Sequence, residues 1–549
     1  MRFDLDHDWQ GNLSTPRAKV GERTKTHLLI LLCLIWLCLG LIGHAPWKPL
    51  ESHAISVIKN ILAGGSWLMP IAASDSALQN PPLYYLTAAA LAKLLSPILS
   101  MHDAARLSSG IWMLITLVIT GMTGRELWGK GFGRQAVLVL IGCLGLVLSA
   151  HTIMPAVSSF CGLTIAFYSF ALAKRRPYRA AILLGISSSI AFLSTGILPV
   201  LIILLTMLVL PLFFAAWRNK SFVQMAIMAV LVALPPILGW CALCLQSTPD
   251  VFITWWQKEL QQFSQLHHLY FAETLLWYAW PALPLAAWGV WRHRLQLLHK
   301  PRFQLILVFF IATFLMLGLA ASDKEVSALP FLIPLTAFAA GSIETLKRGA
   351  AGALNWFGLV LFGLMSFAIW LGWSAMMTGN PAKIKERLLF LSGLQQLNFN
   401  IIAITIAAAV TLIWLLALFR SQRTNRASVT NWAIGLTCVW TLLMTLWLPL
   451  IDSARSYGDV FSSLRAALPQ QFSCMTSSKL GAAQIDLLHY YADVKALKFE
   501  NEQSLNCDLY LIQDEKGRDK VVTTTDWRLI WQGKRLNERR ESFRLYQHI

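Results

Sequence analysis

The sequence is poor in charge. Only 13% of its 549 residues are Asp, Glu, Lys or Arg, about half of the ~25% found in an ordinary soluble domain. Hydrophobic residues make up 56% of the chain, and the mean hydropathy is +0.55. So many apolar side chains cannot all be buried in one or two soluble cores. The composition therefore excludes an ordinary soluble globule and predicts a membrane protein.

Several motifs that carry well-known chemistry are also missing. The sequence has no P-loop, Gly-x-Ser-x-Gly or His-Glu-x-x-His motif, and no Gly-x-Gly-x-x-Gly in a strand context. These absences argue against nucleotide-driven pumping and against serine or zinc hydrolysis. Acidic residues are scarce inside the apolar runs, whereas an ion-coupled transporter needs them for its ion relay. A transporter or lipid flippase is therefore the weakest functional hypothesis.

The basic residues that are present lie between the apolar runs. Residues 452–549 hold 14 basic and 13 acidic side chains, so nearly all of the net charge of +18 belongs to the first 451 residues. There it forms six short clusters, at 125–134, 174–179, 218–220, 292–302, 347–348 and 420–426. Such clusters are typical of cytoplasmic loops. The charge thus indicates orientation in a membrane, and no nucleic-acid partner is expected.

The apolar runs are long enough to cross a bilayer. Measured against a hydrocarbon thickness of ~30 Å, they predict about thirteen transmembrane helices. We place these helices at 28–43, 107–123, 135–150, 156–173, 180–193, 197–216, 223–245, 275–290, 303–321, 328–343, 354–373, 401–419 and 432–451. With a cytoplasmic N-terminus, all six basic clusters fall inside. The first run precedes Pro46 without a small-residue cleavage pattern, which favours an uncleaved anchor over a signal peptide.

This pattern divides the chain into three parts. Residues 1–27 form a cytoplasmic N-terminal segment, residues 28–451 an all-α membrane domain, and residues 452–549 a small α/β domain on the outer, periplasmic side. Within the membrane domain, the outer loop 44–106 carries amphipathic stretches suited to interfacial helices. In the tail, helix-like pieces (460–468, 480–491) alternate with strand-like ones (508–513, 528–531, 543–546).

The nine cysteines divide in the same way. Seven lie in predicted spans, where a thiol acts as a small apolar side chain; the Cys241-x-x-Cys244 pair is among them. Cys474 and Cys507 are the only pair in the tail. An oxidising compartment would allow a disulfide between them, and two free thiols are the alternative.

Glu51 is the first candidate for chemistry. It shares a helical face with Ile55, Ile58 and Leu62, so its carboxylate would turn inward and lose water. Desolvation would raise its pKa, as suits a general base for an acceptor hydroxyl. The alternative is that Pro49 opens a helix and Glu51 merely complements the dipole at its N-terminus.

Other polar residues lie at the predicted outer ends of helices. Asn80, Tyr84 and Tyr85 surround a Pro-Pro pair and offer polar groups to a substrate; a Pro-initiated helix with interfacial tyrosines is the alternative. Arg106, a lone cation at the mouth of a span, suits a phosphate or simply snorkels.

Two further candidate sites lie on the predicted outer side. His151 is a possible base or ligand, although a lone interfacial His is more often neither. Lys324 and Glu325 belong to an outward charge cluster, where Lys324 either pairs with a lipid phosphate or is a solvated loop charge.

The order of these pieces resembles the C-type glycosyltransferase superfamily, above all its aminoarabinose (lipid A) transferase and protein O-mannosyltransferase branch. The family's Pro-Asp-Glu-x-Arg-Tyr is similar to the sequence from Pro49 to Ala54, and its Lys-Pro-Pro-Leu-x-Tyr-Trp to the one from Asn80 to Leu86. Three more family motifs have counterparts here. Ala-x-Arg-Leu-Pro-Ser resembles residues 104–109, Leu-Thr-Lys-Gly resembles residues 193–196, and Ser-Gln-Lys-Glu resembles residues 322–325. Matching features cover most of the chain.

The resemblance implies a thirteen-span fold with an outer soluble tail, and transfer of a sugar from a polyprenyl-phosphate donor to an outer-face acceptor. The family's catalytic carboxylate is an Asp of the first loop, where this chain has Leu50. Its second acid is replaced by Met154, and its two lysines by Asn80 and Thr195. Only Glu51 keeps an acid near the expected site.

The leading hypothesis is therefore a glycosyltransferase of the bacterial inner membrane acting on lipid A, a glycan or a protein. Transfer needs positioning, a base and neutralisation of the departing phosphate, with Glu51 as the base and Arg106 and Lys324 as the phosphate-binding cations. His53, Asn80, Tyr84, Tyr85, His151 and Glu325 are the expected substrate-binding residues. No cofactor is expected, although His53 and His151 leave a divalent ion open. The alternative is a degenerate member that binds lipid-linked glycan or partner proteins without turnover.

Overall fold

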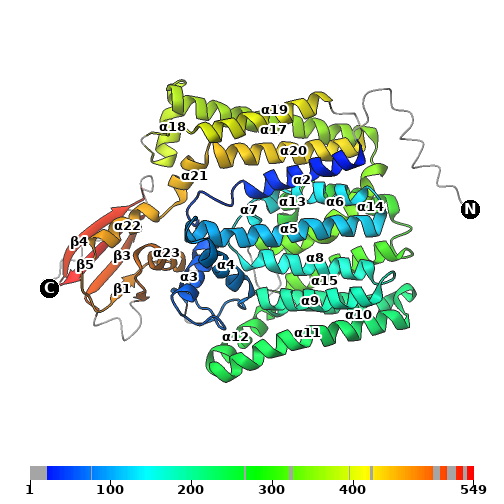
Figure 1. Cartoon of the computed structure of the whole chain (residues 1–549), viewed down its shortest axis with the longest axis horizontal. Helices are drawn as coiled ribbons and strands as arrows, with labels where there is room; N and C mark the ends of the chain where they lie inside the picture. Colours follow the sequence, from blue (N-terminus) through cyan, green and yellow to red (C-terminus); the bar gives the residue numbers. More distant parts are fainter. Residues whose placement is uncertain are drawn as a thin grey trace, which may run out of the picture.

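The computed structural model describes residues 21–75, 77–264, 268–320, 325–394, 396–420, 424–498, 507–515, 527–535 and 541–549. Long helices run roughly side by side, and a small mixed domain lies at one end of them (Figure 1). The bundle contains α2 (Glu22–Cys38), α5 (Met101–Trp128), α6 (Phe132–Ile141), α7 (Leu144–Ser149), α8 (Pro155–Leu172), α9 (Pro177–Thr195), α10 (Ile197–Phe213), α11 (Lys220–Ser247), α13 (His268–Tyr278), α14 (Ala282–His293), α15 (Pro301–Leu319), α16 (Leu332–Ser342), α17 (Arg348–Thr378), α19 (Ile401–Arg420) and α20 (Asn425–Thr445).

The predicted all-α membrane class is confirmed, with a different division into helices. Within the described residues, nine helical stretches are long and apolar enough to cross a membrane. Three expected spans are instead broken, and one of them, 432–451, contains the end of α20 and the start of α21 (Leu448–Arg455). The run 135–150 becomes α6 and α7, separated at Gly142, whose carbonyl accepts a hydrogen bond from Trp432 Nε1 at 2.9 Å. The run 275–290 becomes α13 and α14, interrupted at Pro281, a residue without an N–H for a continuous helix.

The basic clusters gather at one end of α5. Glu126, near the C-terminal end of this helix, pairs with Arg175 at 2.5 Å, and the guanidinium of Arg302 lies 4.7 Å from the Trp128 ring centre. Arg134, just beyond the helix, pairs with Glu22 at the start of α2. The small mixed domain lies at the opposite end of α5, where His102 contacts Tyr490. The two ends of the bundle therefore differ: one carries the basic clusters, and the other contacts the small mixed domain.

Four helices lie in the segments predicted to be on the outer side: α3 (Leu50–Leu62), α4 (Leu83–Leu95), α12 (Pro249–Gln261) and α18 (Ala382–Ser392). The face predicted for α3 is buried at Glu51, Ile55 and Ile58, because α3 packs between α4, α5 and the tail. Leu62 departs from the prediction and is exposed, because it is the last residue of α3 and precedes the turn at Gly64.

The tail forms the predicted α/β domain. It contains α21 (Leu448–Arg455), α22 (Gly458–Ala467), α23 (Ala482–Ala492) and strands β1 (Met475–Ser478), β2 (Ala496–Lys498), β3 (Leu509–Glu515), β4 (Trp527–Lys534) and β5 (Glu541–His548). The strand order is β2-β1-β3-β5-β4; β1 is parallel to β2 and β3, and the other pairs are antiparallel. Buried residues of α22, α23 and the sheet form one core. Strands β1 and β2 were not predicted from the sequence, because they are only four and three residues long.

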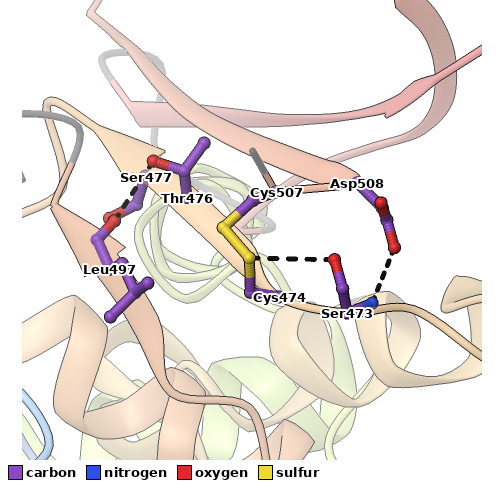
Figure 2. The surroundings of a disulfide bond; sticks show 7 residues. All are labelled: Ser473, Cys474, Thr476, Ser477, Leu497, Cys507 and Asp508. Carbon is purple, nitrogen blue, oxygen red and sulfur yellow. Dashed lines mark hydrogen bonds between the residues drawn. A yellow bond between two sulfur atoms is a disulfide. The ribbon is translucent and has the colours of Figure 1, made fainter. Parts of the chain in front are cut away.

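A disulfide joins Cys474, just before β1, to Cys507, just before β3 (Figure 2). Of the two alternatives that the sequence leaves open, the structure has the disulfide. It lies beside Ser473, whose backbone N–H donates to Asp508 at 2.6 Å. The bond closes the part of the chain that contains α23, the helix that faces the membrane domain.

Candidate functional site

Glu51 and Arg106 form a buried ion pair, which we call the inner ion pair. Arg106 Nε donates to Glu51 Oε1 at 2.8 Å, and Arg106 Nη2 donates to Oε2 at 3.2 Å. Neither side chain is exposed to solvent. The backbone N–H groups of Trp47 and Ile153 also donate to the Glu51 carboxylate, each at 3.0 Å. This one carboxylate therefore joins α3, α5, the chain before α3 and the loop before α8.

The pKa expected for Glu51 is wrong in direction. Burial by itself raises the pKa, but the charge and hydrogen bonds of Arg106 together with the Trp47 N–H outweigh it and lower the pKa of Glu51. Each of these groups favours the charged carboxylate. Glu51 was expected to face an acceptor hydroxyl. Instead, each of its two carboxylate oxygens already accepts two hydrogen bonds from the protein.

Arg106 is equally saturated. Its Nη1 donates to the Leu41 carbonyl and to Asp103, and its Nη2 also donates to the His44 carbonyl. The expectation of a cation at an open mouth, ready for a phosphate, does not match a guanidinium with no exposed surface. A buried charge needs such a complete set of partners. The structure places Arg106 under the outer loop, where it holds the loop to the bundle.

His151 and Tyr84 are likewise buried among protein groups. The two ring nitrogens of His151 contact the carbonyl oxygens of Val147 and Trp36. The Tyr84 hydroxyl lies 2.6 Å from the hydroxyl of Ser109 on α5. Both side chains, predicted to bind substrate, are only 0–2% exposed and connect helices to one another.

A second polar group lies nearer the surface, where α3, α4 and α23 meet. We call His53, Asp75, Asn80, Tyr85 and Asp486 the outer polar cluster. His53 Nδ1 lies 3.3 Å from Asp75 Oδ2 and 3.9 Å from Asp486 Oδ2, and the His53 and Tyr85 rings are 6.5 Å apart. Asn80 Nδ2 donates to the Tyr85 hydroxyl at 3.5 Å. The structure thus brings together three residues predicted from two separate motifs.

The tail supplies one side of this cluster. Asp486 on α23 accepts hydrogen bonds from Ser74 N at 3.0 Å and Ser74 Oγ at 2.9 Å. Burial raises the pKa of Asp486 to about 6, and the nearby charge of Asp75 adds to the rise, although the bonds from Ser74 oppose it. Lys59 further ties α3 to α23 by donating to the carbonyl oxygens of His489 and Tyr490.

Asp75 and Asp486 were missed in the sequence. Asp75 stands in an irregular stretch without a recognisable motif, and Asp486 reads as an ordinary residue of a tail helix. The only available signal was the scarcity of acids in the loop 44–106, which contains Glu51, Asp75 and Asp103.

The remaining candidates are less defined. Lys324 lies outside the described residues, and Glu325 is exposed at the start of the 3₁₀ helix η3 (Glu325–Phe331). In the part of the chain that the structure describes, no cluster of three or more His, Cys, Asp or Glu side chains has the arrangement of a metal site.

Comparison with known proteins gives a consistent result, although no protein-family model matches the sequence. The chain is 25% identical to the undecaprenyl phosphate-alpha-4-amino-4-deoxy-L-arabinose arabinosyl transferase of Edwardsiella ictaluri, over 80% of this chain and 79% of that protein. It is 22% identical to a transferase of the same name from Sodalis glossinidius, over 64% of this chain and 70% of that one.

The fold also matches that of solved structures. The crystal structure of ArnT from Cupriavidus metallidurans bound to undecaprenyl phosphate matches 96% of this chain and 98% of its own, with a TM-score of 0.72 and 14% identity. The apo form of the same protein gives a TM-score of 0.70. The resemblance predicted from the sequence is therefore confirmed: the chain has the C-type glycosyltransferase fold and is similar in sequence to the undecaprenyl-phosphate aminoarabinose transferases.

Proposed function

We propose that this protein is a glycosyltransferase of the bacterial inner membrane, which moves a sugar from a polyprenyl-phosphate donor to an acceptor on the periplasmic face. The observation that carries the proposal is the similarity to aminoarabinose transferases over four fifths of the chain. An aminoarabinose donor and a lipid A acceptor are the first substrates to test, because these relatives are named for that donor sugar.

The orientation follows from charge. The end of the bundle that collects the arginine clusters faces the cytoplasm under the positive-inside rule, which places α2's first residues inside and the tail outside. The Cys474–Cys507 disulfide supports this proposal, because disulfides persist in an oxidising compartment such as the periplasm.

The two polar groups have different tasks in this proposal. The inner ion pair holds the outer loop against α5 and the loop before α8, so that Glu51 and Arg106 position the site without touching the substrate. The outer polar cluster is partly open, with 22% of the His53 side chain and 17% of the Asp75 side chain exposed. Donor and acceptor meet beside this cluster, and Lys324 and Glu325 remain the proposed contacts for the departing phosphate and the substrate.

A second candidate is supported by a specific observation. Leu50, Met154, Asn80 and Thr195 stand where the resembling family has two acids and two lysines, and the remaining acid, Glu51, is saturated by protein donors. This combination favours a degenerate member that binds lipid-linked sugar without transferring it.

One experiment separates the two candidates. The full-length protein in lipid nanodiscs is incubated with undecaprenyl phosphate-aminoarabinose and lipid A, and undecaprenyl phosphate and modified lipid A are measured by mass spectrometry. A transferase yields both products in equal amounts. Donor binding without either product, repeated with hexose and N-acetylhexosamine donors and with glycan and peptide acceptors, supports the degenerate binder and overturns the transferase.

A further inference from the structure

The acidic residues of the outer loop differ in the hydrogen-bond donors that their carboxylates contact. The loop 44–106 contains three: Glu51, Asp75 and Asp103. Glu51 is saturated in the inner ion pair, and Asp103 accepts hydrogen bonds from Arg106 Nη1 at 3.1 Å and from the Gly43 N–H at 3.0 Å. Both carboxylates are thus committed to holding the loop. Asp75 differs from them in position and in partners.

The Asp75 carboxylate has an unfilled hydrogen-bonding position. Its Oδ2 atom is buried and accepts no hydrogen bond from any group in the described residues, although His53 Nδ1 lies 3.3 Å away. A buried acceptor without a donor is costly, and native proteins tend to fill it with a donor from protein, water or ligand. The O–H group of an acceptor substrate is such a donor.

The surroundings fix Asp75 in place. The preceding residue, Ser74, is held by two hydrogen bonds to Asp486 of the tail, and Asp486 is only 2% exposed in its side chain. His53 on α3 lies against Asp75, and Tyr85 on α4 lies beside His53. The Asp75 side chain, which is 17% exposed, therefore lies where α3, α4 and α23 meet, as suits a positioned base.

We propose that Asp75 is the catalytic base of the proposed transfer, and that His53 and Asp486 are its positioning residues. This inference rests on the proposed function and deepens it by assigning the carboxylate that Leu50 cannot supply. The Asp75 carboxylate takes the proton of the acceptor hydroxyl while the acceptor oxygen bonds to the anomeric carbon. The bond from that carbon to the phosphate oxygen breaks, and polyprenyl phosphate leaves with the electron pair.

The test compares carboxylates on the outer face in the full-length protein. Asp75→Asn and Asp75→Glu are assayed for release of undecaprenyl phosphate from undecaprenyl phosphate-aminoarabinose with lipid A. Asp250→Asn is the matched control, because Asp250 is an exposed acid in the first turn of α12. Removing a general base typically costs 10²–10⁴-fold, so we expect Asp75→Asn to lower kcat at least 100-fold with KM within about threefold.

Further measurements distinguish chemistry from structure. Asp75→Asn should keep the wild-type thermal midpoint, and Asp75→Glu should recover part of kcat because it restores the carboxylate. His53→Gln should lower kcat with little change in KM, because His53 lies against the Asp75 carboxylate and positions it. Asp486 and Tyr85 also face Asp75 and are left unchanged in that comparison.

The outcomes identify which idea fails. An active wild type with an equally active, folded Asp75→Asn variant overturns the assignment of Asp75 and leaves the proposed transferase intact. A wild type that releases no undecaprenyl phosphate from any of the donors overturns the proposed function, and the base assignment with it. Loss of kcat in Asp75→Asn alone, with Asp250→Asn unchanged, supports both.

Discussion

The inner ion pair and the outer polar cluster each contain a carboxylate of the outer loop, and the two carboxylates differ in how many hydrogen bonds they accept. Glu51 has four hydrogen bonds, no exposed surface and a lowered pKa, whereas Asp75 has an oxygen that accepts no hydrogen bond within the described residues. A saturated carboxylate stabilises the fold and has little capacity left for a substrate. The comparison teaches that nearness to a family motif is a weaker guide to chemistry than the number of donors already bound.

Removing the cation of the inner ion pair should have the largest effect. Arg106→Met leaves the Glu51 charge buried, and breaking such a pair typically costs about 3–5 kcal/mol. We expect a large fall in the thermal unfolding midpoint in detergent. Arg134→Met is the control, since Arg134 pairs with the exposed Glu22 and surface pairs contribute only about 0–1 kcal/mol. Equal midpoints for the two variants would contradict the structural role of Arg106.

The disulfide should have the next largest effect, confined to the tail. The bond spans 33 positions of sequence, and closing a loop of this length stabilises the folded state by about 3–4 kcal/mol. We expect the double variant Cys474→Ser, Cys507→Ser to expose the tail to proteolysis at a lower temperature, without changing the protease resistance of the bundle. Cys38→Ser, at an exposed free thiol, is the control. A tail with unchanged resistance would show that its core suffices without the bond.

Asp486 should make stability depend on pH in a direction opposite to that of Glu51. Its folded-state pKa is raised from 3.8 to about 6, so between these values the folded state binds more protons than the unfolded state. Its contribution to stability is present at low pH and is lost as pH rises through about 6, by on the order of 2 kcal/mol. Asp486→Asn should remove this slope between pH 4 and 7 in thermal unfolding of the tail. A slope that persists in Asp486→Asn would assign it to another group.

The smallest expected effect is at the rim of the outer polar cluster. Lys59 lies 2.7 Å from Asp493, whose side chain is 63% exposed, so Asp493→Asn should change the unfolding free energy by at most about 0.5–1 kcal/mol. Lys59→Met should cost more, because it also removes donors to two carbonyl groups of α23. Thermal midpoints of both variants measure this difference. Equal effects would mean that the ion pair alone matters.

Much of the fold could be predicted because apolar runs and basic clusters follow from the bilayer itself. Parts of the tail strands β3, β4 and β5 were recognised because these strands are seven or eight residues long, whereas β1 and β2, of four and three residues, are too short to show a period. The broken run at Gly142 was not predictable, because the hydrogen bond made by the Gly142 carbonyl there comes from Trp432, a residue of another helix 290 positions away.

The candidate site was predicted in part. Local motifs drew attention to His53, Asn80 and Tyr85, and the structure brings them together. The same motifs also selected Glu51 and Arg106, whose burial depends on partners from four segments that no spacing rule connects. Asp486 could not be found from sequence, because its contact with Ser74 spans 412 positions.

That long-range contact also orders the assembly of the protein in time. Helices α3 and α4 are synthesised early, whereas α23, which packs against α3 (Figure 1), is made only after the last helix of the bundle. A chain that stops before residue 482 contains every membrane helix described above and still lacks Asp486. The outer polar cluster is therefore completed by a segment that is made after all of these helices, so a product truncated before residue 482 is left with an unfinished site.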